Sequence, residues 1–422
     1  MITYMKGLRC VRCGEEIGYE RVVYSCPRCG GLLDPYYNYN SIAENVKRED
    51  VSRRPSFIWK WKELLPVINE SNIVSLGEGG TPLIKCDKIA EALGVSELYV
   101  KDDALTNPTG SLKDRQISVG VSKAVELGYD TTFTITSGNN GASLAAYSAK
   151  AGLKCVIIFT TGATKEKMLM ATALGARTIK IKGEDSLVAA AVNNVLSGKK
   201  LDWYDCGFRV FEPFMYEGRK TNAMEVCESL GWKNPDWVLH PSVGSMGVIK
   251  AWKGYKELSK LGWTTGKLPK MTAVQPANVA PIVKAFREEL SEIVPVEPGK
   301  TIAEAIACAD TGDLGKWTLD ALRESGGSAV GVTDDDVVYG LKLLAREGIF
   351  VEPSAAVTIP AVKKLLDEGV ADRNEIFVCE VTGAGWKNLS FAEGAFGLPK
   401  VIPPEEKEIK KFLSEYLENF SA

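Results

Sequence analysis

A lysine at the start of a predicted helix is the first residue whose setting favours chemistry. Lys113 follows a loop that contains Pro108 and Gly110. Ser111 is placed to cap the next helix, whose apolar positions begin at Ile117. The positive end of a helix dipole lowers the pKa of an ammonium group and favours the neutral amine that a Schiff base requires. Taken alone, Lys113 is also compatible with a solvated lysine at a helix start, so its interpretation depends on three other loops.

These three loops contain glycine, follow predicted strands and have the residue types that bind anions or a heterocyclic ring. Residues 136–143 and 241–247 each lead into a helix, where backbone N–H groups can hold a carboxylate or a phosphate. The third loop, residues 381–385, offers the hydroxyl of Thr382, which can hydrogen-bond a ring nitrogen without supplying charge. Each loop alone is compatible with an ordinary turn. Because ligands of open α/β sheets bind beyond the carboxyl ends of the strands, the loops and Lys113 together predict one site.

The composition argues against several other kinds of function. The chain has 422 residues, of which 45% are hydrophobic and 25% charged, and is long enough for two or three domains. A formal net charge of -3 argues against a protein that binds nucleic acids or membrane surfaces by charge. The single histidine, His240, ends a predicted strand and disfavours a serine–histidine triad. No apolar run has bilayer length and no signal peptide is recognised, so a cytoplasmic location is expected.

Two Cys-x-x-Cys pairs near the N-terminus have the spacing of a tetrahedral metal site. Their members are Cys10, Cys13, Cys26 and Cys29. Two thiolate pairs at this spacing bind Zn²⁺, and a short strand predicted over residues 19–24 gives residues 1–36 the outline of a zinc ribbon. A ribbon that folds by packing without a metal is the alternative. We interpret it as a structural segment, because no basic cluster interleaved with aromatic residues follows it.

The rest of the chain predicts an α/β fold. Residues 37–73 are expected to be a connector that packs on the main body, and residues 401–422 a C-terminal helix. Between them, short apolar strands alternate with amphipathic helices, which is typical of a mostly parallel sheet covered on both faces. Strands are predicted over 98–100, 131–136, 155–160, 177–182, 237–240, 271–274 and 376–381, and helices over 141–151, 164–174, 185–196, 248–261 and 333–346.

In this order, the motifs resemble those of the fold type II pyridoxal-phosphate enzymes, and most closely the threonine synthases. Residues 77–83 are similar to the family's entry motif, 107–115 to its Schiff-base lysine segment, 137–143 to its Ser-Gly-Asn loop and 349–356 to its Glu-Pro stretch. The resemblance implies a tryptophan-synthase-β-like fold with two open, mostly parallel sheets. It implies a larger cofactor-binding domain (residues 74–105 and 210–400), a smaller domain (106–209) and a homodimer.

The resemblance also implies roles for individual residues. Lys113 would hold pyridoxal 5'-phosphate and act as acid and base, and Thr382 would face the ring nitrogen. Asn139 would bond the ring hydroxyl of the cofactor. The cofactor phosphate would be held by Gly244, Ser245, Met246 and Gly247. The amino-acid substrate would be bound by Thr109, Thr136, Ser137, Gly138 and Asn140.

The residues at the positions that bind the substrate in threonine synthases depart from the family pattern. Where threonine synthases usually have serine, asparagine and arginine that hold the phosphate of O-phosphohomoserine, this chain has Val210, Glu212 and Met215. Such a lining suits a dianion poorly, unless a cation reaches the site; the candidates are Arg219, Lys220 and Lys165. Three functions therefore stay open: a threonine synthase, an enzyme of β-elimination or β-replacement on a serine-, threonine- or cysteine-type amino acid, and a non-catalytic binding protein.

Overall fold

The structure is a computed structural model that describes residues 2–183, 185–196, 202–207 and 211–420. The chain forms two compact units, Met1–Lys387 and Asn388–Ala422. The second unit contains α15 (Leu389–Phe396) and α16 (Glu406–Phe420), the latter within the predicted C-terminal helix. Within the described ranges, no helix is long and apolar enough to cross a membrane. The features that follow all belong to the first unit.

The N-terminal segment is a small antiparallel sheet in the order β2-β1-β3. Its strands are β1 (Met5–Cys10), β2 (Glu16–Ile17) and β3 (Leu33–Tyr37). Leu8, Leu33 and Tyr37 are buried and belong to the main hydrophobic core. The strand predicted over 19–24 is wrong: these residues form bends and irregular chain between β2 and β3.

The connector winds over the body in short helical turns. They are α1 (Tyr39–Asn45), α2 (Arg48–Ser52), η1 (Ile58–Leu64) and η2 (Glu70–Asn72). Trp59 is buried, and its indole N–H donates to Glu78 Oε1 at 3.1 Å and to Ser118 Oγ at 2.9 Å. Ser118 lies on α4 (Lys113–Glu126), so this contact fixes the connector against the helix that carries Lys113.

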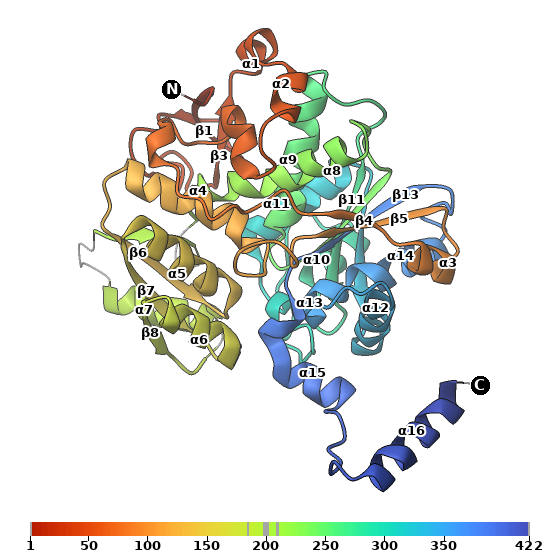
Figure 1. Ribbon diagram of the computed structural model, residues 1–422. Coiled ribbons are helices and arrows are strands. Elements are labelled where there is room, and N and C mark those ends of the chain that lie inside the picture. The colour runs from red at the N-terminus through yellow and green to blue at the C-terminus, as the bar shows by residue number, and fades with distance from the viewer. Residues whose placement is uncertain (1, 184, 197–201, 208–210, 421–422) are drawn as a thin grey trace. The chain divides into compact units, whose positions relative to one another are not determined.

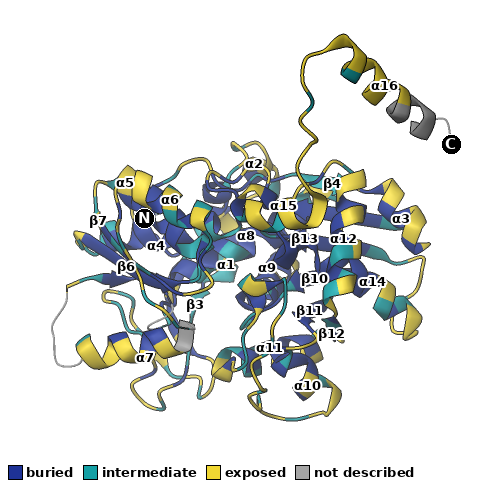
Figure 2. Cartoon of the chain, turned by 90° about the horizontal axis from the view of Figure 1, so that it is seen from below, coloured by how far each residue is buried: buried dark blue, intermediate teal, exposed yellow. Residues whose placement is uncertain are grey.

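The larger sheet has six strands in the order β12-β11-β10-β13-β5-β4. Figure 1 shows β13 beside β5 in this sheet. They are β4 (Leu83–Lys85), β5 (Glu97–Asp102), β10 (Trp237–Pro241), β11 (Lys270–Pro276), β12 (Ser328–Val332) and β13 (Ile376–Val381). All pairings are parallel except β4 with β5. Most strand residues are buried, as expected where helices cover both faces (Figure 2).

The smaller sheet is wholly parallel, in the order β8-β7-β6-β9. Its strands are β6 (Thr131–Thr136), β7 (Lys154–Phe159), β8 (Arg177–Lys180) and β9 (Tyr204–Asp205). The associated helices are α5 (Asn139–Ala151), α6 (Lys165–Ala173) and α7 (Asp185–Leu196). The predicted α/β class with two open, mostly parallel sheets is confirmed.

The remaining helices of this unit connect and cover the strands. They are α3 (Asp87–Leu93), η3 (Met215–Lys220), α8 (Thr221–Ser229), α9 (Met246–Lys260), α10 (Pro281–Arg287), η4 (Glu304–Ile306), α11 (Gly312–Glu324), α12 (Asp334–Arg346), α13 (Pro353–Ala356) and α14 (Thr358–Asp367), with η5 (Gly385–Asn388) at the boundary. Helix α4 is unusual because every residue from Asp114 to Ala124 is buried. The lysine at its start is therefore presented by an interior helix.

Candidate active site

The carboxyl ends of strands from both sheets meet at a cavity of about 230 Å³. Three loops contribute to its wall: those that follow β6, β10 and β13. Ten of the residues predicted from the sequence line it, namely Lys113, Thr136, Ser137, Asn139, Asn140, Gly244, Ser245, Met246, Gly247 and Thr382. Residues that are far apart in the sequence are thus brought into one place, at the edge where the topology of parallel sheets predicts it.

Two predicted substrate residues, Thr109 and Gly138, do not line the cavity. The backbone N–H and the hydroxyl of Thr109 both donate to Asp114, each at 2.7 Å. Gly138 has a φ of 147°, and a Cβ there would lie 2.4 Å from Lys167 Cδ. Both residues therefore shape the turns behind the cavity wall.

Lys113 is the first residue of α4 and is half-buried in the cavity wall. The N-cap is Leu112 and not Ser111, but the Ser111 hydroxyl still accepts from the Lys113 N–H at 3.1 Å. Among the described residues, the Lys113 amine has no hydrogen-bond or ion-pair partner. Burial, and then the positive charge of Arg219, hold its pKa well below the usual value, so the amine is available in its neutral form.

The loop before α9 has the form of a phosphate cradle. Ser245 adopts a left-handed conformation with φ 60°, and its buried hydroxyl lacks any hydrogen-bond partner in the described chain. A Cβ at Gly247 would lie only 3.0 Å from His240 Nδ1, a tight contact that glycine avoids. An unsatisfied hydroxyl and the free N–H groups of a long helix suit a phosphate. This part of the cavity therefore fits the phosphate of pyridoxal 5'-phosphate.

Asn139 takes part in a contact across the cavity that the sequence did not predict. Its amide donates to Glu352 Oε1 at 2.7 Å, and Lys167 Nζ donates to Glu352 Oε2 at 2.9 Å. Both Lys167 and Glu352 line the cavity. Glu352 lies in the Glu-Pro stretch, which was the only signal for it. The Thr382 hydroxyl has no partner within the described ranges, which leaves it available to a ring nitrogen.

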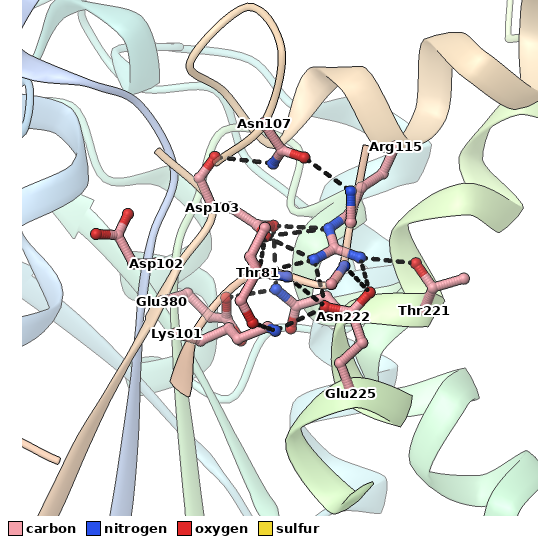
Figure 3. A network of polar contacts seen from close by, with 12 residues as sticks. Thr81, Lys101, Asp102, Asp103, Asn107, Arg115, Thr221, Asn222, Glu225 and Glu380 are labelled. Carbon is pink, nitrogen blue, oxygen red and sulfur yellow. Dashed lines mark hydrogen bonds and ion pairs between the residues drawn. The ribbon is translucent and has the colours of Figure 1, made fainter. Parts of the chain in front are cut away.

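Arg115, two residues after Lys113 on α4, is the centre of a buried network of charges (Figure 3). Its guanidinium bonds the carboxylates of Asp103 and Glu225, at 2.7 and 2.6 Å for the shortest contacts. Lys101 Nζ donates to Glu225 as well, at 2.7 Å. Although burial raises the pKa of Asp103, the charge of Arg115 outweighs it and lowers the pKa below its usual value. The network ties α4 to β5 and α8. No local motif indicates it, because its members are distant in sequence.

The segment that was expected to line the site of the substrate phosphate differs from the prediction. Val210 lies outside the described residues. Glu212 is buried, and its carboxylate accepts from the backbone N–H groups of Phe214 at 3.1 Å and of Met215 at 2.5 Å, which caps η3. Met215 is buried in the core against Gly120. The prediction that Glu212 and Met215 line the cavity is wrong.

Two residues of η3 line the cavity where Glu212 and Met215 were expected. They are Tyr216 and Arg219. Of the two other candidate cations, Lys220 is buried against Glu217 and Glu257, at 2.6 and 2.8 Å, and Lys165 is not part of the wall. Only Arg219 among the three candidates therefore reaches the site.

The four N-terminal cysteines come together in the ribbon. Their Sγ atoms all lie within 4.8 Å of one another, with Cys10 and Cys29 at 3.5 Å and Cys13 and Cys26 at 3.7 Å. Four sulfurs bound tetrahedrally at ~2.3 Å from a zinc ion would lie ~3.8 Å apart. The observed sulfur positions fit such an ion.

Comparisons with known proteins agree with this geometry. The family model for pyridoxal-phosphate dependent enzymes matches residues 74–383. The chain is 43% identical to a threonine synthase of Methanocaldococcus jannaschii, over 96% of this chain and 99% of that protein. It is 41% identical to a threonine synthase of Methanosarcina acetivorans, over 90% and 91% of the two chains.

Solved structures with the same fold have lower identity. Maize serine racemase superposes with a TM-score of 0.60 at 17% identity, covering 81% of this chain and 94% of the other. Diaminopropionate ammonia lyase from Escherichia coli gives a TM-score of 0.63 at 17% identity, covering 79% and 94%. At such identities the likeness concerns the fold alone.

Proposed function

Because the chain belongs to the pyridoxal-phosphate-dependent enzymes and, within them, to the threonine synthases, we propose that it converts O-phosphohomoserine and water into threonine and inorganic phosphate. The single observation that carries this proposal is the relationship to threonine synthases over nearly the whole chain. The cavity supports it, because it is lined by a phosphate cradle together with a lysine amine and a threonine hydroxyl that have no partner among the described residues.

When bound, the cofactor would supply an electron sink for the reaction. Lys113 would hold it covalently, and its amine would hold and move protons at the carbon atoms of the substrate. Residues 244–247 would hold the cofactor phosphate through backbone N–H groups and the Ser245 hydroxyl. The Thr382 hydroxyl would bond the ring nitrogen without charging it, which would moderate the electron sink and favour elimination and replacement over transamination.

The loop before α5 binds the substrate carboxylate in this proposal. Thr136, Ser137, Asn139 and Asn140 line the cavity beside the start of α5, where N–H groups and small polar side chains favour a carboxylate. Thr109 and Gly138 act indirectly, by fixing the turns that precede α4 and α5. Asn139, whose amide now bonds Glu352, is the residue that would turn to the ring hydroxyl of the cofactor.

The ribbon holds a structural zinc ion in this proposal, through Cys10, Cys13, Cys26 and Cys29. The sulfur separations support it. The homodimer, the cytoplasmic location and the division into a larger domain and a smaller domain over residues 106–209 stay predictions from the family resemblance and the sequence.

The direct test is turnover of purified, cofactor-loaded protein. O-phosphohomoserine should release phosphate and threonine in equal amounts, and the Lys113→Ala variant should release neither. O-phosphoserine, threonine and serine form the comparison panel. A keto acid from one of these, with no conversion of O-phosphohomoserine, would replace the proposal with β-elimination.

A further inference from the structure

Among the described residues, the cavity wall carries three basic side chains but a single acid. Lys113, Lys167 and Arg219 line it together with Glu352. Lys167 is neutralised by its ion pair with Glu352 at 2.9 Å. Lys113 is reserved for the cofactor and has a pKa well below the usual value. Arg219 is therefore left as a positive charge without a counter-ion among the described residues.

The position of Arg219 is fixed by hydrogen bonds at one end only. Its Nε donates to Gln116 Oε1 at 2.5 Å, and Gln116 Nε2 donates to Asn140 Oδ1 at 2.7 Å. Asn140 in turn donates to the carbonyl of Cys206 at 2.9 Å. The terminal nitrogens of the guanidinium have no hydrogen-bond partner in the described part of the chain, while Arg219 remains half-buried in the wall.

The backbone places Arg219 in this wall. Glu212 caps η3 by accepting two backbone N–H groups, and the short helix then turns Met215 into the core and Tyr216 and Arg219 towards the cavity. The guanidinium carbon lies 5.6 Å from the centre of the Tyr216 ring. A planar aromatic neighbour on one side leaves the donor edge of the guanidinium available to a ligand.

The charge on Arg219 persists at neutral pH. Burial lowers its pKa to about 10, which still leaves the group protonated. A charge that is partly withdrawn from water without a counter-ion is costly, and the cost is relieved when a dianion forms paired N–H···O bonds with the free guanidinium edge. Such a site is specific for phosphate over a neutral hydroxyl group.

We propose that Arg219 binds the phosphate of the substrate and thereby selects a phosphorylated amino acid. The inference rests on the proposed function, in which the bound cofactor and substrate together carry three anionic groups. The cradle at residues 244–247 takes the cofactor phosphate, and the loop at residues 136–140 takes the substrate carboxylate. Arg219 takes the third group, because Lys167 is paired with Glu352, Lys113 is reserved for the cofactor, and Arg219 is the cation of the described wall that is left without a counter-ion.

The experiment compares wild type with Arg219→Gln and Arg219→Lys, all loaded with cofactor. Arg219→Gln should raise KM for O-phosphohomoserine about 100-fold, with kcat changed far less, since the lost contact is made in both ground and transition states. Arg219→Lys should recover part of the loss, because it restores the charge without the paired donors. Arg177→Gln, an exposed arginine on β8, is the matched control and should change neither constant.

A second readout does not depend on turnover. Inorganic phosphate should bind wild-type holoprotein, as followed by calorimetry, and bind Arg219→Gln about 100-fold more weakly. Equal phosphate affinity in the two proteins would overturn the inference. Loss of cofactor in parallel with the substitution would also overturn it, since the guanidinium would then hold the cofactor phosphate.

The two proposals can fail separately. If wild type does not convert O-phosphohomoserine while phosphate affinity still depends on Arg219, the proposed function fails and the anion site stands. If wild type converts it and Arg219→Gln leaves KM and phosphate affinity unchanged, the inference about Arg219 fails alone. Thermal unfolding midpoints of the variants, equal to that of wild type, establish that a change in KM is not a folding defect.

Discussion

Arg115 and Glu225 face each other through two parallel hydrogen bonds, Nη1 to Oε1 at 2.6 Å and Nη2 to Oε2 at 2.7 Å. Both side chains are fully or almost fully buried. Arg115 lies two residues after Lys113 on the interior helix α4, and Glu225 lies on α8. The pair therefore determines where the start of α4, and with it the lysine, is held.

Glu225→Gln should destabilise the protein by about 3–5 kcal/mol, because Arg115 and Lys101 would keep their charges without a full counter-charge. The measurement is urea unfolding followed by tryptophan fluorescence. The control is Asp367→Asn, which removes one partner of an ion pair whose side chains are each 55% exposed and should cost below about 1 kcal/mol. Equal effects of the two substitutions would contradict the role of the network.

Lys113 should be the residue that binds the cofactor covalently. Borohydride treatment of holoprotein should fix the cofactor irreversibly to the peptide that contains Lys113, as identified by mass spectrometry. The rival is Lys387, a buried lysine whose pKa burial lowers to about 8 and which donates to the Thr109 carbonyl at 2.6 Å. Lys113→Ala should lose the visible absorbance of the bound cofactor. Labelling of Lys387 in wild type would contradict the prediction, because Lys387 and not Lys113 would then bind the cofactor covalently.

Thr382→Ala should lower kcat about 100-fold while cofactor content stays unchanged, because the hydroxyl acts on the ring nitrogen and not on retention. Thr382→Ser keeps a hydroxyl and should recover most of the activity. The measurements are steady-state kinetics together with the absorbance maximum of the bound cofactor. An unchanged kcat for Thr382→Ala would remove the proposed role.

Glu212 makes the stability of the protein depend on pH. Burial raises its pKa from 4.5 to about 7. A carboxyl group whose pKa rises on folding contributes stability below its unfolded pKa, and that contribution is lost as pH rises through the folded pKa. Glu212→Gln cannot ionise, so its free energy of unfolding relative to wild type should increase by up to about 3 kcal/mol between pH 4.5 and 7. A difference that is flat over this range would contradict the assignment.

The ribbon should contain one zinc ion per chain, as measured by elemental analysis of purified protein. Cys26→Ser should lower the zinc content and the temperature at which the ribbon unfolds, because three thiolates close the site poorly. The matched control is Cys308→Ser, whose thiol lies outside the cluster and should leave the zinc content unchanged. Wild-type protein without zinc would show that the ribbon folds by packing.

The sequence predicted the parts of the fold that depend on local patterns. Helix α7 spans Asp185–Leu196 and strand β13 spans Ile376–Val381, both with the predicted bounds. Thr333 caps α12 through reciprocal bonds with Asp336, as a capping threonine should. Strand β12 was missed because Ser328–Val332 contains serine and glycine, which weaken the apolar pattern, and its strand character comes from pairing with β11.

The candidate site was predictable where loops carry glycine and was not where residues act through distant partners. Lys113, Ser245 and Thr382 follow from local motifs. Glu212 was predicted to line the cavity, but it is buried and accepts hydrogen bonds from two backbone N–H groups. These bonds depend on a turn that no pattern of residue types specifies. The same holds for the partner of Arg115, which lies more than a hundred residues further along the chain.

The position of β13 has a consequence for synthesis of the chain. It lies between β10 and β5 in the sheet, although it is the last strand of the described chain. Figure 1 shows β13 beside β5. Until residues 376–381 leave the ribosome, β5 and β10 each present an unpaired edge on which β13 later pairs, a setting in which long-range pairing is slow and aggregation-prone. Thr382 follows this strand directly, so the nascent chain completes the cofactor site and closes the sheet in the same event. A chain that ends before residue 376 would thus have neither a complete cofactor site nor a closed sheet, and should be a target for chaperones and proteases.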